Sequence, residues 1–197
     1  MDVGAVLVAV AGVAGTLGAA LLTQQGAEKA KRRELEMTQA LQDARENQEL
    51  RRRCYTELHR DARQFCTALS RHLYVLRDRT PGDEDVRALE AAKDTYRDRW
   101  SEALMIAPDA VIGPAGEVNG ALNSVYGQVK RLEGNPRPGE SLHSAAEAQH
   151  RIWSLIAAAR EAMRRDLGVT GSGTRLRSPD DPESVTRDFE EPDRGRS

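Results

Sequence analysis

The side chains best suited to chemistry are two cysteines and four histidines, and their spacing forms no recognisable site. Cys54 and Cys66 lie twelve residues apart, which on one helix is about 18 Å, so free thiols are expected. His143 and His150 are seven residues apart, too far to share a metal ion without other ligands. No HExxH or CxxC pattern occurs. We therefore predict no catalytic, cofactor-binding or metal-binding residue, and a protein that is not an enzyme.

Two other patterns resemble phosphate-binding sequences without meeting their requirements. Residues 168–173 contain glycines but lack the Lys-Ser/Thr signature of a phosphate loop, so they are interpreted as a linker. Arg51, Arg52 and Arg53 are flanked by glutamates, and helical spacing distributes them around the helix. The formal net charge of −2 gives no overall attraction to polyanions. A salt-bridged helix face is predicted here, and nucleic acid is not expected as a partner.

The most apolar segment has the properties of a membrane anchor. Residues 3–22 carry no charge, and twenty helical residues extend about 30 Å, the thickness of a bilayer's hydrocarbon core. Four basic side chains follow this segment: Lys29, Lys31, Arg32 and Arg33. Basic residues beside a span stay on the cytoplasmic side and attract anionic lipid. We predict a single-pass anchor at 1–23, its N-terminus outside, the remaining chain cytoplasmic, and these four side chains at the inner leaflet.

A cleavable signal peptide is the alternative interpretation of this segment. Gly18, Ala19 and Ala20 mimic a small-residue cleavage site, and cleavage there would release an exported helical protein. The apolar run is, however, longer than the usual 7–15 or so residues, and residues 1–2 include no Lys or Arg. These two features favour the anchor.

Small residues recur on one face of the predicted span. Ala11, Gly15 and Gly18 are spaced i, i+4, i+7, a pattern that permits close helix packing in lipid. The pattern indicates either a dimerisation face or simply a span rich in alanine. The expected partners are therefore the bilayer and a second copy of the chain, bound through the span or the stalk defined next.

Residues 24–49, called the stalk below, are predicted to form a polar helix, either separate from the span or continuous with it. The segment 24–79 contains no proline, and strong helix formers dominate it. Met37, Leu41 and Ala44 form a thin apolar stripe along the stalk. This stripe predicts either a weak coiled-coil seam or a solvated helix.

Residues 50–169 contain thicker apolar stripes at steps of three and four, which are typical of helices that face a core. The residues expected to face the core are Leu50, Cys54, Leu58, Ala62, Phe65, Leu69, Leu73, Leu76, Val86, Leu89, Lys93, Tyr96, Trp100, Leu104, Val118, Leu122, Val125, Val129, Leu132, Ala145, Ile152, Ile156, Ala159 and Met163. No alternating strand pattern occurs. An antiparallel bundle of about four helices is predicted.

Turn residues set the expected helix ends. Asp83 is predicted to cap the second helix, and residues 108–116, with two prolines and two glycines, to form a connection with one short turn at 109–112. Residues 134–139 predict a loop. Ser141 or Ser144 is expected to open the last helix, with Ser144 and Glu147 matching a capping box. Gly168 is expected to end that helix in the left-handed conformation.

The overall prediction is an all-α chain with four parts. They are the anchor at 1–23, the stalk at 24–49, the bundle at 50–169 and a disordered tail at 170–197. The tail is rich in Gly, Ser, Pro and charge, and cannot bury enough apolar surface to offset the entropy of ordering.

The N-terminal sequence resembles that of small single-pass membrane proteins of actinomycetes, including the Kil-type plasmid-spread proteins. The resemblance lies in the apolar run 5–10 and in the segment 15–20, about a tenth of the chain, after which a charged helix begins. Residues 163–168 also resemble the ends of helical domains in actinomycete proteins. The resemblance implies a role in plasmid transfer or spread and supplies no catalytic residue.

The function expected from the sequence is that of a membrane-anchored, non-catalytic interaction or scaffold module, whose bundle or tail recruits an unidentified cytosolic protein. The alternatives are a plasmid-spread protein, an exported helical protein and, last, an enzyme of unrecognised type.

Overall fold

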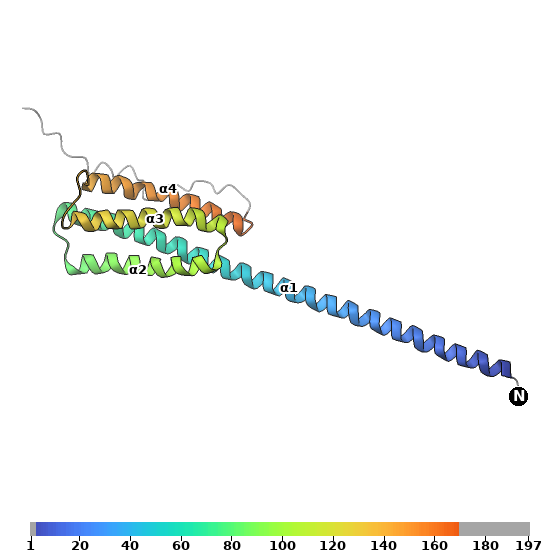
Figure 1. Cartoon of the computed structure of the whole chain (residues 1–197). Helices are drawn as coiled ribbons and strands as arrows, with labels where there is room; N and C mark the ends of the chain where they lie inside the picture. The colour runs from blue at the N-terminus through green and yellow to red at the C-terminus, as the bar shows by residue number, and fades with distance from the viewer. Residues whose placement is uncertain (1–2, 170–197) are drawn as a thin grey trace, which may run out of the picture. The chain divides into compact units, whose positions relative to one another are not determined.

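The structure, a computed structural model, describes the backbone of residues 3–169 and the side chains of residues 29 and 31–169. This part of the chain forms four α-helices and no strand: α1 (Val3–Asp78), α2 (Asp83–Ile106), α3 (Asp109–Leu132) and α4 (Leu142–Asp166) (Figure 1). The all-α prediction is therefore confirmed for the described residues. The predicted tail at 170–197 lies outside them.

The chain divides into two units, Met1–Gln48 and Glu49–Ser197, and α1 contributes to both. In the first unit every side chain from 31 to 48 is exposed, including those of Met37 and Leu41. No helix among the described residues is long and apolar enough to cross a bilayer. The side chains of the predicted span, including the Ala11, Gly15 and Gly18 face, lie outside the described residues.

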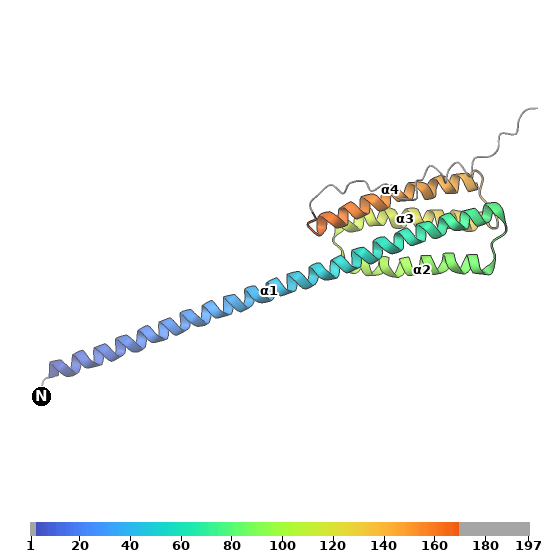
Figure 2. The same cartoon turned by 180° about the vertical axis from the view of Figure 1, so that it is seen from behind.

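The second unit is a four-helix bundle in which consecutive helices run antiparallel. Two opposite views place α2 and α4 on opposite sides, with α1 and α3 between them (Figures 1 and 2). Most of the expected stripes form its core, and Phe65, Leu122 and Ile152 are fully buried. The bundle prediction is confirmed.

Side-chain size explains why the helices are unevenly spaced. α3 packs closely on α4, whereas α2 approaches α3 at few positions. The buried face of α4 is rich in alanine, including Ala145 and Ala146. Between α2 and the rest of the bundle stand aromatic rings, with the Phe65 centroid 5.9 Å from that of Tyr96 and 6.2 Å from that of Tyr126. Helix spacing follows the side chains at the contact, so alanines let helices approach and rings hold them apart.

The start of α3 differs from the prediction. The helix begins at Asp109 and runs through Pro114, so residues 109–116 belong to the helix and not to a connection. Proline removes one helical hydrogen bond and is unfavourable there. Val111 and Ala115 nevertheless lie on the same face as Val118, and all three are buried. Their burial stabilises the extra turns.

The predicted Asp83 cap and the Ser144–Glu147 capping box were wrong, whereas Ser141, one of the two residues expected to open the last helix, does so. α2 is capped at Gly82, whose backbone N–H donates to Asp85 Oδ2 at 2.8 Å, so Asp83 is the first helical residue instead. Ser141 caps α4 and accepts from the Ser144 backbone N–H at 3.1 Å. The Ser144 hydroxyl accepts in turn from the Ser141 N–H at 2.9 Å. The capping box is therefore formed by Ser141 with Ser144, and not by Ser144 with Glu147.

Other end signals were correct. Residues 134–139 form the loop between α3 and α4, and Gly168 ends α4 with φ of 70°. In the core prediction, Leu50 and Leu104 were wrong, with 48% and 50% of their surface exposed. Leu50 lies where α1 enters the bundle, and α2 buries Ala103 in place of Leu104.

A candidate binding groove between α1 and α2

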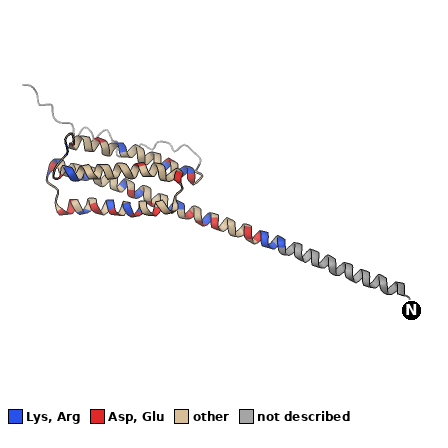
Figure 3. Cartoon of the chain, in the orientation of Figure 1, with Lys and Arg blue, Asp and Glu red and all other residues tan. Residues whose placement is uncertain are grey.

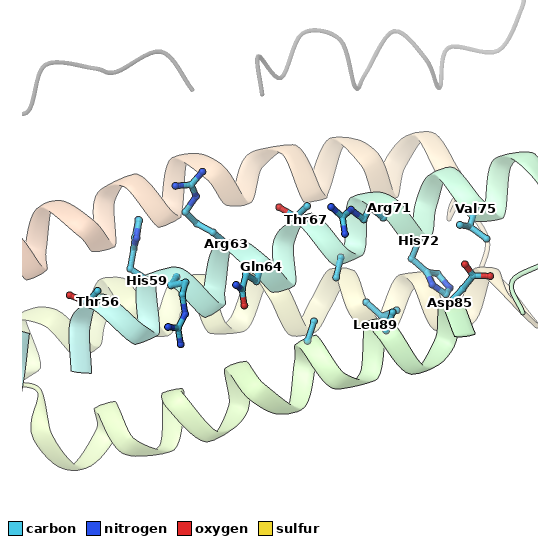
Figure 4. A pocket seen from close by; sticks show the side chains of 14 residues that line it. Thr56, His59, Arg63, Gln64, Thr67, Arg71, His72, Val75, Asp85 and Leu89 are labelled. Atoms are coloured by element: carbon cyan, nitrogen blue, oxygen red, sulfur yellow. The ribbon is translucent and has the colours of Figure 1, made fainter. Parts of the chain in front are cut away.

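A groove of about 860 Å³ opens between α1 and α2, along the side of the bundle where α2 stands away from its neighbours. Arg60, Arg63 and Arg71 of α1 line its rim. Figure 4 shows Arg63 extending from α1 toward α4 and Arg71 further along α1. The α2 side contributes Asp85, which pairs with Arg79, and the small side chains of Ala88 and Ala92, with the buried Leu89 beneath them. The groove therefore combines guanidinium groups with an apolar floor.

Small residues on α2 produce the groove. Ala88 and Ala92 line it, at positions where longer side chains would fill the space beside α1. α2 makes its main core contacts through Leu89, Tyr96 and Ala103, each one heptad apart. A helix attached by so narrow a stripe leaves open the surface beside that stripe.

Carboxylates of α1 connect the two helices below the arginine rim. Asp61 is only 1% exposed, and its Oδ1 accepts from Arg60 Nε at 2.8 Å. Arg99 of α2 reaches across, with its Nε 3.4 Å from Asp61 Oδ2 and its Nη1 2.9 Å from Glu57 Oε2. Both acids are thus engaged in the connection between α1 and α2.

The other two rim arginines have no carboxylate partner among the described side chains. The Arg63 guanidinium lies 5.8 Å from the Trp153 ring centroid, a cation–π contact that leaves its charge in place. Arg71 is exposed on the rim. The rim therefore has positive charge to offer to an anionic ligand.

The histidines of the groove serve different purposes. Burial, with Arg63 and Arg160 nearby, lowers the pKa of His59 below its ordinary value, so its imidazole is neutral at neutral pH. His72 closes the far end, where its Nε2 lies 2.6 Å from Glu133 Oε1 at the C-terminal end of α3.

Both cysteines are buried and free. Burial raises the pKa of Cys54 to about 11 and that of Cys66 to about 12. Gln149 Nε2 lies 3.2 Å from the Cys66 carbonyl oxygen and also 3.2 Å from its Sγ, which connects α1 to α4. Protonated buried thiols are poor nucleophiles. The two cysteines therefore act in packing. The groove can recognise a ligand by its charge and shape.

The residues singled out in the sequence lie in several places. Lys29 and residues 31–33 are exposed on α1. Figure 3 shows basic and acidic positions, in blue and red, distributed along the described part of α1 and along the bundle helices. Arg51 lies 3.3 Å from Asp166 and Arg53 3.3 Å from Glu57, as expected for a salt-bridged face. None of them lines the groove. The sequence signal for the groove is a set of arginines on one helix that lies beside alanines on the next helix. This signal can be recognised only once it is known which helices are neighbours.

The described part of the chain places no three His, Cys, Asp or Glu side chains where they could hold a metal ion. Two smaller hollows accompany the groove, one in the apolar core and one between α3 and α4. Comparisons with family models, curated proteins and solved structures found nothing that matches this chain.

Proposed function

We propose that this protein is a membrane-tethered, non-catalytic interaction module whose α1–α2 groove binds an acidic segment of a protein partner. The observation that carries this proposal is the combination of two arginines with an apolar floor formed by Ala68 and Ala92. Arg63 and Arg71 have no carboxylate partner among the side chains that the structure describes. Arginine binds carboxylates through paired N–H donors, and an apolar floor adds affinity for a flanking hydrophobic side chain.

The state of the histidines and cysteines in the described part of the chain supports binding over catalysis. His59 is neutral, His72 is hydrogen-bonded to Glu133, and the two thiols are buried. A catalytic site needs a nucleophile or base directed at a substrate. The groove presents hydrogen-bond donors, which suit recognition.

The proposed tether rests on the sequence of the first unit. The segment 3–22 carries no charge, and Lys29 and residues 31–33 follow it. In our proposal the segment crosses the membrane with its N-terminus outside, and each basic side chain contributes about 1 kcal/mol of attraction to anionic lipid on the inner side. The bundle then faces the cytoplasm.

The stalk supports self-association of the tethered protein. Leu35, Met37 and Leu41 expose 55%, 69% and 54% of their surface. A helix that is solvated on all sides remains marginal unless it pairs with another or carries many ion pairs along its length. No ion pair joins two of the described stalk residues up to 48. We propose that two copies pair along the stripe of Met37, Leu41 and Ala44.

The tether is tested by placing charge in the span. Val10→Arg with Val13→Arg is expected to move the chain out of the membrane pellet after an alkaline wash, because each central arginine costs about 2.5–3.5 kcal/mol. Thr23→Arg with Gln25→Arg, at the flank, is the matched control and should stay in the pellet. A C-terminal reporter should be active inside the cell. If the unaltered chain is wholly soluble, the tether is wrong.

The groove is tested separately with the detergent-solubilised full chain. Arg63→Ala with Arg71→Ala is expected to weaken partner capture by about tenfold, since each exposed charge pair lost costs up to about 1 kcal/mol. Arg87→Ala with Arg97→Ala, on an exposed part of α2 outside the groove, is the control. Equal capture by the two variants would remove the groove from the proposal.

A further inference from the structure

The groove has an excess of positive charge that originates in the composition of α1. Between residues 49 and 75 the helix has only three acidic side chains, Glu49, Glu57 and Asp61. Glu57 and Asp61 are both held by Arg99. An occupant that complements Arg63 and Arg71 must therefore be acidic, and it gains from an apolar side chain opposite Ala68 and Ala92.

One segment of this chain has that composition. Residues 180–193 include seven Asp or Glu and one Arg, a net charge of −6 (1 − 7). In the middle of this segment stands Phe189, one of the two phenylalanines of the chain. The other, Phe65, is fully buried in the core. The segment thus has both carboxylates for the rim and an aromatic ring for the floor.

The chain is long enough to bring this segment to the groove. α4 ends at Asp166, and Asp166 Oδ2 accepts from the Tyr55 hydroxyl at 2.7 Å, next to Thr56 at the start of the groove. The thirteen residues 167–179 span up to about 40 Å when extended. The groove from Thr56 to Val75 is about 28 Å long on a helix. Every part of it lies within reach.

We propose that residues 180–193 bind in the α1–α2 groove of the same chain and compete there with the acidic segment of the partner. Carboxylates flanking Phe189 contact Arg63 and Arg71, and the phenyl ring lies on Ala68 and Ala92. A short connection gives the segment an effective concentration in the millimolar range, so a partner must displace it. This inference depends on the groove being the binding site, and is independent of the membrane tether.

The first test measures competition with a synthetic peptide of residues 178–194 on the solubilised full chain. A chain whose seven acidic residues in 180–193 are changed to Asn or Gln should bind the peptide about tenfold more tightly than the unaltered chain, because its groove is vacated. Arg63→Glu with Arg71→Glu in that neutralised chain should abolish binding, and Arg87→Glu with Arg97→Glu should not. Equal affinity for the unaltered and neutralised chains overturns the inference.

The second test locates the segment directly. Spin labels on Ala91→Cys and Ser184→Cys should give a narrow, short distance distribution in the full chain, and the buried Cys54 and Cys66 should stay unlabelled. Arg63→Glu with Arg71→Glu should broaden this distribution, whereas Arg87→Glu with Arg97→Glu should leave it unchanged. A short distance that disappears on dilution with unlabelled chain would show exchange between copies and refute binding within one chain.

The outcomes separate this inference from the function on which it rests. If the rim variants lose the partner while the distance distribution is broad in every chain, the groove binds the partner and the inference about the C-terminal segment fails. If the rim variants lose neither, both fail.

Discussion

α2 and α4 are of nearly equal length, 24 and 25 residues, yet they are attached to the bundle in different ways. α4 buries eight side chains, four of which are alanines, and α2 buries three. α2 relies more on polar connections: Arg99 reaches α1, and the Tyr126 hydroxyl of α3 donates to Glu90 at 2.5 Å. One side of the bundle is a packed core, and the other is a helix held by a narrow stripe and by charges.

This difference indicates how a small bundle can be both stable and able to bind. The α3–α4 side supplies the buried apolar area that stabilises folding. The α2 side buries less apolar area, and the space beside Ala88 and Ala92 forms part of the groove. Substitutions on the two sides should therefore change stability and local opening by different amounts. The expected effects decrease from the core outward.

The largest effect is expected at the junction of the two sides. Phe65→Ala removes a fully buried ring that contacts Tyr96 of α2 and Tyr126 of α3. The free energy of unfolding should fall by about 3–5 kcal/mol, measured by urea denaturation. Leu104→Ala, half exposed on α2, is the control and should change it by less than about 1 kcal/mol. Similar losses for both variants would contradict the described core.

The next effect concerns the charge connection of α2. Arg99→Met removes the contacts to Glu57 and Asp61 and leaves the Asp61 carboxylate buried with Arg60 alone. The free energy of unfolding should fall by about 1.5–3 kcal/mol. Backbone amides of α2 should exchange hydrogen faster than before, and those of α4 should change little, because their packing does not involve Arg99. Uniform acceleration across all four helices would mean that α2 is not separately held.

The sequence predicted the parts of the fold that depend on neighbouring residues. Apolar side chains three and four residues apart identified the buried face of α4 from Ala145 to Met163, and Gly168 identified its end. The beginning of α3 was missed because the unfavourable Pro114 is offset by tertiary burial of Val111 and Ala115, which no local pattern reveals.

The candidate site was not predictable for a related reason. Asp61 and Gln149 are polar residues that lie buried because partners on other helices satisfy them, Arg99 for one and the backbone of Cys66 for the other. The groove likewise depends on which residues of α2 face the arginines of α1. These pairings are set by helix packing across the bundle, and periodicity within one helix does not specify them.

The two cysteines allow a smaller test of the same asymmetry. The charges of Arg99 and Glu102 on α2 act on Cys54, whereas the Gln149 side chain of α4 donates a hydrogen bond to the Cys66 sulfur. Both thiols have raised pKa values and are buried, so alkylation requires local opening. We expect Cys54 to react about tenfold faster than Cys66 under native conditions, followed by mass spectrometry, and Arg99→Met to widen the ratio. If Cys66 reacted faster than Cys54, the α4 side would open more readily than the α2 side, contrary to the looser attachment of α2.

The smallest expected effect compares the two connections that lead into α2 and α4. In each connection a carboxylate accepts one hydrogen bond from a backbone N–H and another from an arginine. The carboxylate is Asp85, with Arg79, at the start of α2, and Glu140, with Arg131, before α4. The arginine first, and the backbone N–H second, lower the pKa of Asp85 and of Glu140 to about 2. These contributions to stability are present above the ordinary pKa of each acid and are lost as the pH falls towards 2.

Acid titration of single variants separates the two connections. Arg131→Ala and Arg79→Ala should each reduce the loss of stability between about pH 5 and pH 2, because the acid then titrates near its ordinary value in both folded and unfolded chains. Arg131→Ala should act over the wider range, since the ordinary value is 4.5 for Glu140 and 3.8 for Asp85. Solvent screens both pairs, so the changes should shrink in high salt. An acid transition identical to that of the unaltered chain in both variants would show that neither arginine stabilises its carboxylate in solution.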